Sequence, residues 1–232
     1  MRVAVISFPG SNCDRDVLHA LRYVLQIDAD LVWHKTADLS SYDAAILPGG
    51  FSYGDYLRAG VIAAFSPAMK EVRRMAEEGL PMLGICNGFQ LLIESGLLPG
   101  ALLRNLSLKF ICRWVYVRVE NDRTTFTRII PRGALLRMPI AHNEGRYFID
   151  GDDLRRLEER GQVVFTYVNE RGEASLDANP NGSVANIAGV CNEEGNVLGM
   201  MPHPERCSEE ILKSSDGLKI FTSIVKGIMA VR

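Results

Sequence analysis

The sequence lacks the features that mark most secreted, membrane-bound and nucleic-acid-binding proteins. Its 232 residues include five cysteines, an odd number without C-x-x-C spacing, so neither a disulfide framework nor a structural zinc site is expected. The net charge is −2 and no basic run exceeds two residues, which argues against nucleic-acid or polybasic membrane binding. No stretch approaches the roughly 18 apolar residues of a membrane span, and the first residues resemble a strand more than a signal peptide. We therefore expect a cytoplasmic protein.

What the sequence does contain is an alternation of short apolar runs and amphipathic stretches. Its first half predicts strands at 2–8, 29–34, 44–50 and 81–85, and helices from Asp14, over 66–78 and after Cys86. The second half predicts strands at 110–120 and 162–168, a charged helix at 150–161, a hairpin around 194–196 and a last helix at 218–229. This order predicts one α/β domain over residues 1–232, an open, mostly parallel sheet with helices on both faces plus a smaller antiparallel β part.

The stretch "GICNG" places Cys86 between two glycines, directly after an apolar run. A lone cysteine is more often a small buried hydrophobe than a nucleophile. Strand, Gly-x-Cys-x-Gly and helix, however, form the pattern of a nucleophile elbow, in which the helix points its first amides at the sulfur and favours the thiolate. In that interpretation the amide of Asn87 stabilises an oxyanion, and Gly50 in "PGG" supplies the second amide unless this pair is only a turn.

A cysteine nucleophile generally needs a histidine base that a third group orients. Two histidines have a glutamate two residues later, His142 with Glu144 and His203 with Glu205, and residues so spaced share a face of an extended chain. The prolines on both sides of His203 restrict its backbone, which favours this histidine as a rigidly held base. Spacing alone leaves both candidates open.

The motif "GICNGFQ" at 84–90, together with "HPE" at 203–205, resembles the class I glutamine amidotransferases. Four longer stretches resemble a branch of this family that serves purine biosynthesis: "FPGSNCDRD" (8–16), "PGGFSYGDYLRAG" (48–60), "IAHNEGRY" (140–147) and "NEEGNVLGMMPHPER" (192–206). The resemblance implies a flavodoxin-like class I glutaminase fold and a triad of Cys86, His203 and Glu205. It further implies an oxyanion hole around Gly50 and Asn87, and a substrate contact from Gln90. Asn143 departs from the family, which usually has glycine there.

The resemblance also implies a division of labour between subunits. The glutaminase releases ammonia from glutamine without a metal or organic cofactor, and the chain contains no P-loop or dinucleotide-binding motif. ATP and Mg are therefore expected on a partner synthetase subunit, with a small third subunit completing the complex. The loop of His142, Asn143 and Glu144 is a candidate for substrate or interface contacts, and 10–16 and 51–60 are candidate docking or channel surfaces. Cys13 is expected to be structural.

Other functions fit parts of the sequence. The chain could serve a different amidotransferase, or be a cysteine-elbow hydrolase of the intracellular protease-like family, which would not need Gln90 or a His-x-Glu element near the C-terminus. A flavodoxin-like interaction module without catalysis would need no reactive thiol. A glutamine-derived adduct on Cys86 would separate a glutaminase from the cysteine-elbow hydrolase and from the interaction module.

Overall fold

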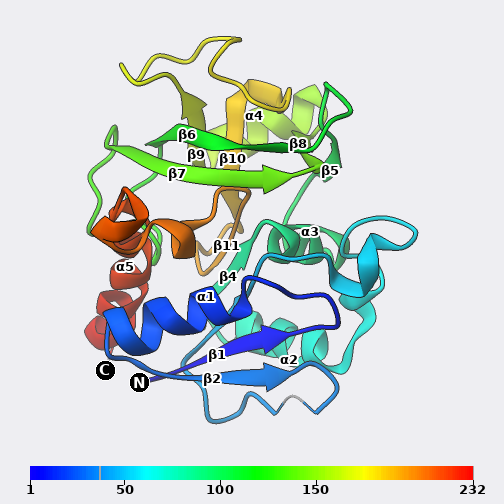
Figure 1. Ribbon diagram of the computed structural model, residues 1–232, viewed down its shortest axis with the longest axis vertical. Coiled ribbons are helices and arrows are strands. Elements are labelled where there is room, and N and C mark those ends of the chain that lie inside the picture. Colours follow the sequence, from blue (N-terminus) through cyan, green and yellow to red (C-terminus); the bar gives the residue numbers. More distant parts are fainter. Residues whose placement is uncertain (37, 232) are drawn as a thin grey trace.

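The computed structural model describes residues 1–36 and 38–231, and a nine-stranded sheet runs through them (Figure 1). One part of the sheet is parallel, in the order β2 (Asp28–Trp33), β1 (Arg2–Ser7), β3 (Ala44–Leu47), β4 (Met82–Ile85) and β11 (Val197–Met200). Strands β3 and β4 are buried along their whole length, as expected for short apolar strands that are covered on both faces.

The rest of this sheet is antiparallel. It continues from β11 through β10 (Ile187–Cys191), β9 (Val163–Val168), β6 (Ile111–Val119) and β7 (Leu135–His142). Burial alternates strictly along β7, so only one of its faces lies in the core. A separate two-stranded antiparallel sheet pairs β5 (Ala101–Arg104) with β8 (Glu144–Phe148). The smaller antiparallel part predicted from the sequence is thus confirmed, but most of it extends the main sheet.

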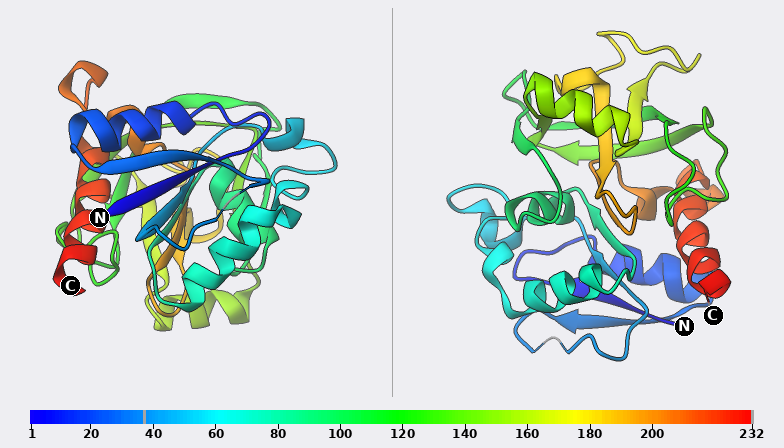
Figure 2. Two further views of the ribbon diagram at one scale, coloured as in Figure 1. Left: turned by 90° about the horizontal axis from the view of Figure 1, so that it is seen from below. Right: turned by 180° about the vertical axis from the view of Figure 1, so that it is seen from behind.

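Helices cover both faces of the parallel strands. Figure 2 shows α1 (Asp14–His19), continued by the π-helical turn η1 (Ala20–Val24), on the opposite side from α2 (Pro67–Glu77). The remaining helices are α3 (Asn87–Glu94), α4 (Gly151–Glu159), α5 (Asp216–Val231) and the 3₁₀ turns η2 (Ser52–Asp55), η3 (Ala63–Phe65), η4 (Val184–Asn186), η5 (Pro204–Cys207) and η6 (Glu210–Leu212). No helix in the described part of the chain has the length and apolar character needed to cross a membrane.

The predicted elements of the first half match the structure closely. Helix α2 begins at Pro67, whose fixed φ suits a first helical position, and ends before Gly79, which has a φ of +80°. The hairpin predicted around 194–196 is formed by β10 and β11. Strands β5, β7 and β8, which carry part of the candidate site, were not predicted from the sequence.

Candidate active site

Cys86 lies at the turn between β4 and α3, and its backbone is strained. Its φ of 51° and ψ of −102° are rare for a residue with a side chain, and the thiol is 5% exposed. The two glycines permit this turn because a methyl group at Gly84 would lie 2.6 Å from the carbonyl oxygen of Gly88, and one at Gly88 would collide with the carbonyl of Leu47. The structure therefore has the geometry of the predicted elbow.

His203 and Glu205 form a buried pair beside this elbow. The Nδ1 atom of His203 lies 2.6 Å from Oε1 of Glu205, and the two side chains are 2% and 0% exposed. His203 is extended, as predicted, but Glu205 lies in the 3₁₀ turn η5. The amide of His203 donates to the carbonyl of Pro139 in β7, which anchors the turn.

The environment of His203 favours its protonated form. Burial alone would lower the pKa of His203, but the Glu205 carboxylate and the Cys86 thiol outweigh it and raise that pKa well above 6.5. Nδ1 is engaged by Glu205, whereas Nε2 is buried without a hydrogen-bond partner among the described residues. A proton on Nε2 is therefore available to a reacting group.

His142 has the opposite character. Its Nδ1 lies 3.0 Å from Oδ1 of Asn105, not against Glu144, so this His-x-Glu element does not form a pair. The physical reason is that β7 ends at His142 while Glu144 begins β8 and turns toward Arg104, 3.6 Å away. Burial, followed by the charge of His203, lowers the pKa of His142 to about 3. A histidine with so low a pKa is a weak base far from its best working range, so His142 is poorly suited as the general base.

The two residues predicted as oxyanion donors, Gly50 and Asn87, both lie next to Cys86. Gly50 lines two cavities together with Cys86, and its backbone amide has no acceptor within the described chain. Only glycine fits there, because its φ is +153° and a methyl group would lie 2.8 Å from the carbonyl oxygen of Gly10. Asn87 begins α3, so its amide has no intrahelical acceptor, and its side chain accepts from the amide of Ser52 at 3.1 Å.

Comparison with known proteins identifies the fold family. The sequence model of the CobB/CobQ-like glutamine amidotransferase domain matches residues 1–226. The chain belongs to this family. It is 60% identical over 225 residues to phosphoribosylformylglycinamidine synthase subunit PurQ of Thermomicrobium roseum, covering 97% of this chain and 95% of that one. For the PurQ subunit of Aquifex aeolicus the identity is 54%, with 97% and 99% covered.

Solved structures agree with this membership. A chain in the structure of PurLQS from Thermotoga maritima superposes with a TM-score of 0.86 at 48% identity, and the match covers 97% of both chains. A glutamine amidotransferase of the same organism superposes with a TM-score of 0.57 at 19% identity, covering 100% of this chain and 97% of that one. At that identity the likeness shows the fold alone.

On one side of Cys86 this amidotransferase has a cavity of about 200 Å³. Gln90 lines it, but the amide of Gln90 is already engaged: it donates to the carbonyl of Glu144 at 2.6 Å and accepts from Asn87 at 2.8 Å. Asn143 also lines the cavity, without a positive φ, so the departure from glycine causes no backbone strain. Gln90 thus holds the Glu144 loop against the elbow.

Two charged residues of this cavity escaped the sequence analysis, Asp55 and Arg104. Asp55 has a φ of 55° and a buried oxygen, Oδ1, without a partner among the described residues. Burial, and then the charge of Glu144, raise the pKa of Asp55 to about 6. The sequence signal for Asp55 was the turn-rich "FSYGD"; Arg104 ends a strand that the sequence did not predict. The cavity therefore offers one cationic and two acidic groups near Cys86.

A second cavity, of about 230 Å³, lies on the other side of Cys86. His203, Cys13 and Arg206 line it. The donor atoms of Cys13, His203 and Glu205 lie within 4.8 Å of one another, a spacing that a metal ion could use. However, Arg206 donates to Sγ of Cys13 at 3.1 Å and Glu205 is occupied by His203. A guanidinium at that distance opposes a cation, so this cluster is better suited to an internal hydrogen-bond network.

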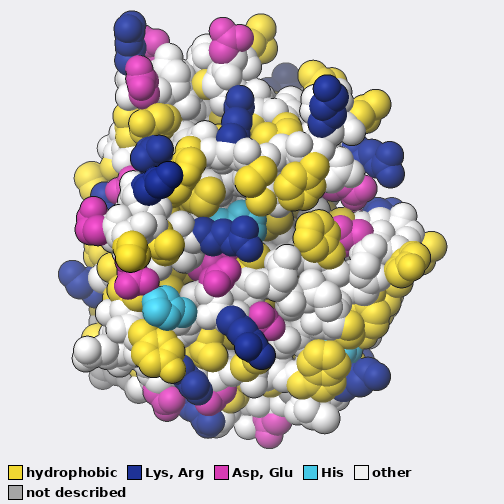
Figure 3. All heavy atoms as spheres, viewed as in Figure 1, with side chains coloured by type: hydrophobic (Ala, Val, Ile, Leu, Met, Phe, Trp, Pro, Cys, Tyr) yellow, Lys and Arg dark blue, Asp and Glu magenta, His cyan; other side chains and the backbone are white. Residues whose placement is uncertain are grey.

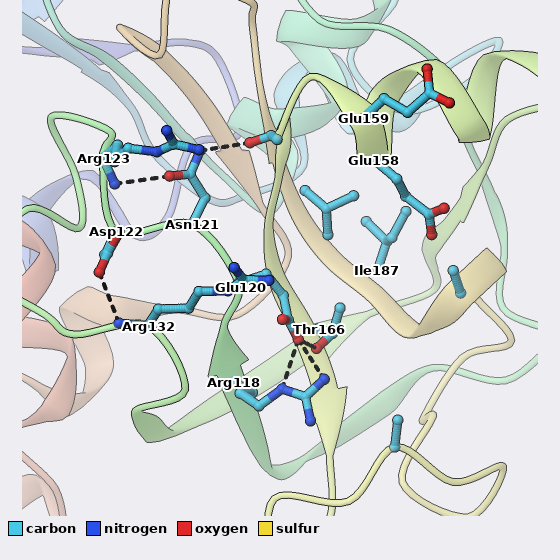
Figure 4. A pocket seen from close by; sticks show the side chains of 14 residues that line it. Arg118, Glu120, Asn121, Asp122, Arg123, Arg132, Glu158, Glu159, Thr166 and Ile187 are labelled. Carbon is cyan, nitrogen blue, oxygen red and sulfur yellow. Dashed lines mark hydrogen bonds and ion pairs between the residues drawn. The ribbon is translucent and has the colours of Figure 1, made fainter.

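A charged hollow that does not touch Cys86 lies between the end of β6 and α4 (Figure 4). Its volume is about 640 Å³, and Arg118, Glu120 and Thr166 on its wall satisfy one another, with contacts of 2.6 to 2.7 Å. None of the buried polar atoms left unpaired in the described chain belongs to its lining residues.

On the face shown in Figure 3, acidic and basic side chains are interspersed, without a patch of one sign.

Proposed function

We propose that this chain is the glutaminase subunit of a phosphoribosylformylglycinamidine synthase. It hydrolyses glutamine to glutamate and ammonia, and the synthetase subunit uses that ammonia to convert formylglycinamide ribonucleotide to formylglycinamidine ribonucleotide in purine biosynthesis. The observation that carries this proposal is the buried His203–Glu205 pair beside a cysteine elbow, in a chain 60% identical to a subunit of that enzyme.

The chemistry follows from the arrangement of the triad. Cys86 attacks the carboxamide carbon of glutamine as a thiolate, and the amides of Gly50 and Asn87 stabilise the oxyanion that forms. His203 delivers the Nε2 proton to the departing nitrogen, which leaves as ammonia and a γ-glutamyl thioester. Nε2 then takes a proton from water, whose oxygen attacks the thioester and releases glutamate. Glu205 keeps the other proton on Nδ1 and fixes the ring.

The 200 Å³ cavity supplies groups that recognise the amino-acid end of glutamine. Asp55 and Glu144 are suited to its ammonium group, and Arg104 is suited to its carboxylate. An ammonium group would also satisfy the unpartnered oxygen of Asp55. Amides that lack the α-amino group should therefore be poor substrates.

The synthetase subunit and a small third subunit are the partners in this proposal, and ATP and Mg bind to the synthetase subunit. The exposed side chains of Tyr56 and Leu57 follow the cavity residue Asp55 in the chain and are 73% and 92% exposed. Apolar side chains that protrude beside an active site are suited to a protein interface. The cytoplasm, where purine nucleotides are made, is the proposed location.

The test is to assay Cys86→Ala in the reconstituted complex with glutamine and, separately, with ammonium chloride. We expect loss of the glutamine-dependent reaction and retention of the ammonium-dependent one, because the partner performs the second half of the chemistry. Cys191→Ala, a buried cysteine in β10, is the matched control and should retain both activities. If Cys86→Ala lost both activities to the same degree, or neither, the proposal would be wrong.

A further inference from the structure

Cys13 lies against the histidine of the triad, although the sequence indicated only a structural role. It immediately precedes α1, is 2% exposed, and its Sγ lies 3.9 Å from Nδ1 of His203. The carbonyl of Gly49 accepts from the amides of Asn12 and Cys13 at 3.4 and 3.2 Å. The loop before α1 is therefore fixed to the loop that carries the proposed oxyanion donor Gly50.

Gly49 and Cys13 both pack against the imidazole of His203. A methyl group at Gly49 would lie 2.7 Å from Cε1 of His203 and 3.0 Å from Sγ of Cys13, so both residues border the same edge of the ring. The hydrogen bond between Nδ1 and Glu205 fixes one atom of the ring, but by itself it leaves the ring free to tilt about that bond. The sulfur of Cys13 fills the space beside this edge of the ring, and close-packed side chains leave a ring little room to move.

The thiol is also fixed from its outer side. Its hydrogen is donated to Oδ1 of Asn12 at 3.1 Å, and Arg206 donates to the sulfur at 3.1 Å. Arg206 lies in η5, three residues after His203, and also pairs with Asp16 of α1 at 3.6 Å. Arg206 and Cys13 thus connect the turn of the catalytic histidine to the start of α1.

We propose that Cys13 is a positioning residue for glutamine hydrolysis, whose sulfur, held by Arg206, keeps the His203 ring aimed at Cys86. This proposal rests on the function proposed above. Burial raises the pKa of the Cys13 thiol, so this thiol keeps its own proton and does not take the proton that His203 carries. Cys13 acts through the imidazole and makes no bond to the substrate.

The test compares Cys13→Ala, Cys13→Ser and the control Cys191→Ala in steady-state glutamine hydrolysis by the complex. Cys13→Ala should lower kcat about tenfold with little change in KM, less than the ~10²-fold that a 1 Å misplacement can cost. Cys13→Ser keeps a hydroxyl that can bond to Arg206 and Asn12, so it should recover most of kcat. Cys191→Ala removes an equally buried thiol and should leave kcat unchanged.

A second measurement reports directly on the ring. The rate at which iodoacetamide alkylates Cys86 is measured as a function of pH. Mass spectrometry of tryptic peptides distinguishes this alkylation from that of the exposed Cys112, which lies in the peptide "FICR". In Cys13→Ala the alkylation profile should move to higher pH, because a displaced imidazolium stabilises the thiolate less. Unchanged kcat and profile in Cys13→Ala, or an equal kcat loss in Cys13→Ser and Cys191→Ala, would overturn the proposal. An active Cys86→Ala would instead overturn the function on which it rests.

Discussion

Glu205→Gln is the perturbation that tests the orienting carboxylate most directly. The substitution preserves the shape of a side chain that is 0% exposed, and removes only the negative charge at 2.6 Å from Nδ1 of His203. A hydrogen bond to a charged group contributes about 2 kcal/mol. If that contribution is realised in the transition state, kcat falls about 30-fold. KM should change little, because Glu205 does not line the cavity assigned to glutamine.

The loss of the Glu205 charge should also shift the pH profile of kcat in a definite direction. Glu205 opposes the effect of burial and holds the pKa of His203 well above 6.5, so the wild-type imidazole keeps its proton to higher pH than a free histidine does. Without the carboxylate, that pKa falls. The alkaline limb of the kcat profile should therefore move to lower pH, because the form that protonates the leaving nitrogen is lost earlier.

The free energy of unfolding should depend on pH through the same pKa of His203. A folded-state pKa above the unfolded value of 6.5 contributes free energy of unfolding that is complete below pH 6.5 and disappears as the pH rises through the folded pKa. The difference in Tm between wild type and Glu205→Gln should thus be largest below pH 6.5 and shrink in alkali. The assays are glutamate release and thermal unfolding over the same pH series. An alkaline limb that stays in place while kcat falls would refute the role of the Glu205 charge in holding the proton on His203.

Two further predictions concern the elbow and the substrate cavity. Gly88→Ala should lower the free energy of unfolding by about 1–3 kcal/mol in urea titration, because its methyl group meets the carbonyl of Leu47, whereas the control Gly151→Ala, which has open space at a helix start, should lose none. For Asp55→Asn, KM for glutamine at pH 7.5 should rise about tenfold through loss of a charged contact. The wild-type KM should fall as the pH rises through about 6, where Asp55 ionises, and a variant with that same pH dependence would contradict the assignment.

The elbow could be predicted from the sequence because its determinants are local. Gly84, Cys86 and Gly88 are neighbours in the chain, and the close approach of Gly84 to the carbonyl of Gly88 lies within that segment, although Gly88 also packs against the distant carbonyl of Leu47. The same holds for the strand and helix on either side. The pairing of His203 with Glu205 spans two residues, so spacing could suggest it even though the 3₁₀ turn was not foreseen.

The rest of the site depends on contacts that no local pattern contains. Asn105 holds His142 across 37 residues, and Cys13 reaches His203 across 190. Such contacts depend on the order of the strands in the sheet. That order brings the C-terminal end of β7 to Cys86 and the start of α1 to His203. The missed strands β7 and β8 explain why Glu144 was considered as a partner for His142.

The two histidines show why residue type and spacing were insufficient to choose a base. Both are buried, at 3% and 2% exposure, and each is followed by a glutamate at the same interval. What separates them is the charge on the group that meets Nδ1, which is a neutral amide for His142 and a carboxylate for His203. Burial lowers the pKa of both rings, but at His203 the Glu205 carboxylate, together with Cys86, reverses this effect, so His203 is the ring whose surroundings favour the protonated form. Burial is the main reason that the pKa of His142 is low, and the positive charge of a protonated His203 lowers it further. The site thus holds a single mobile proton on the histidine that faces Cys86.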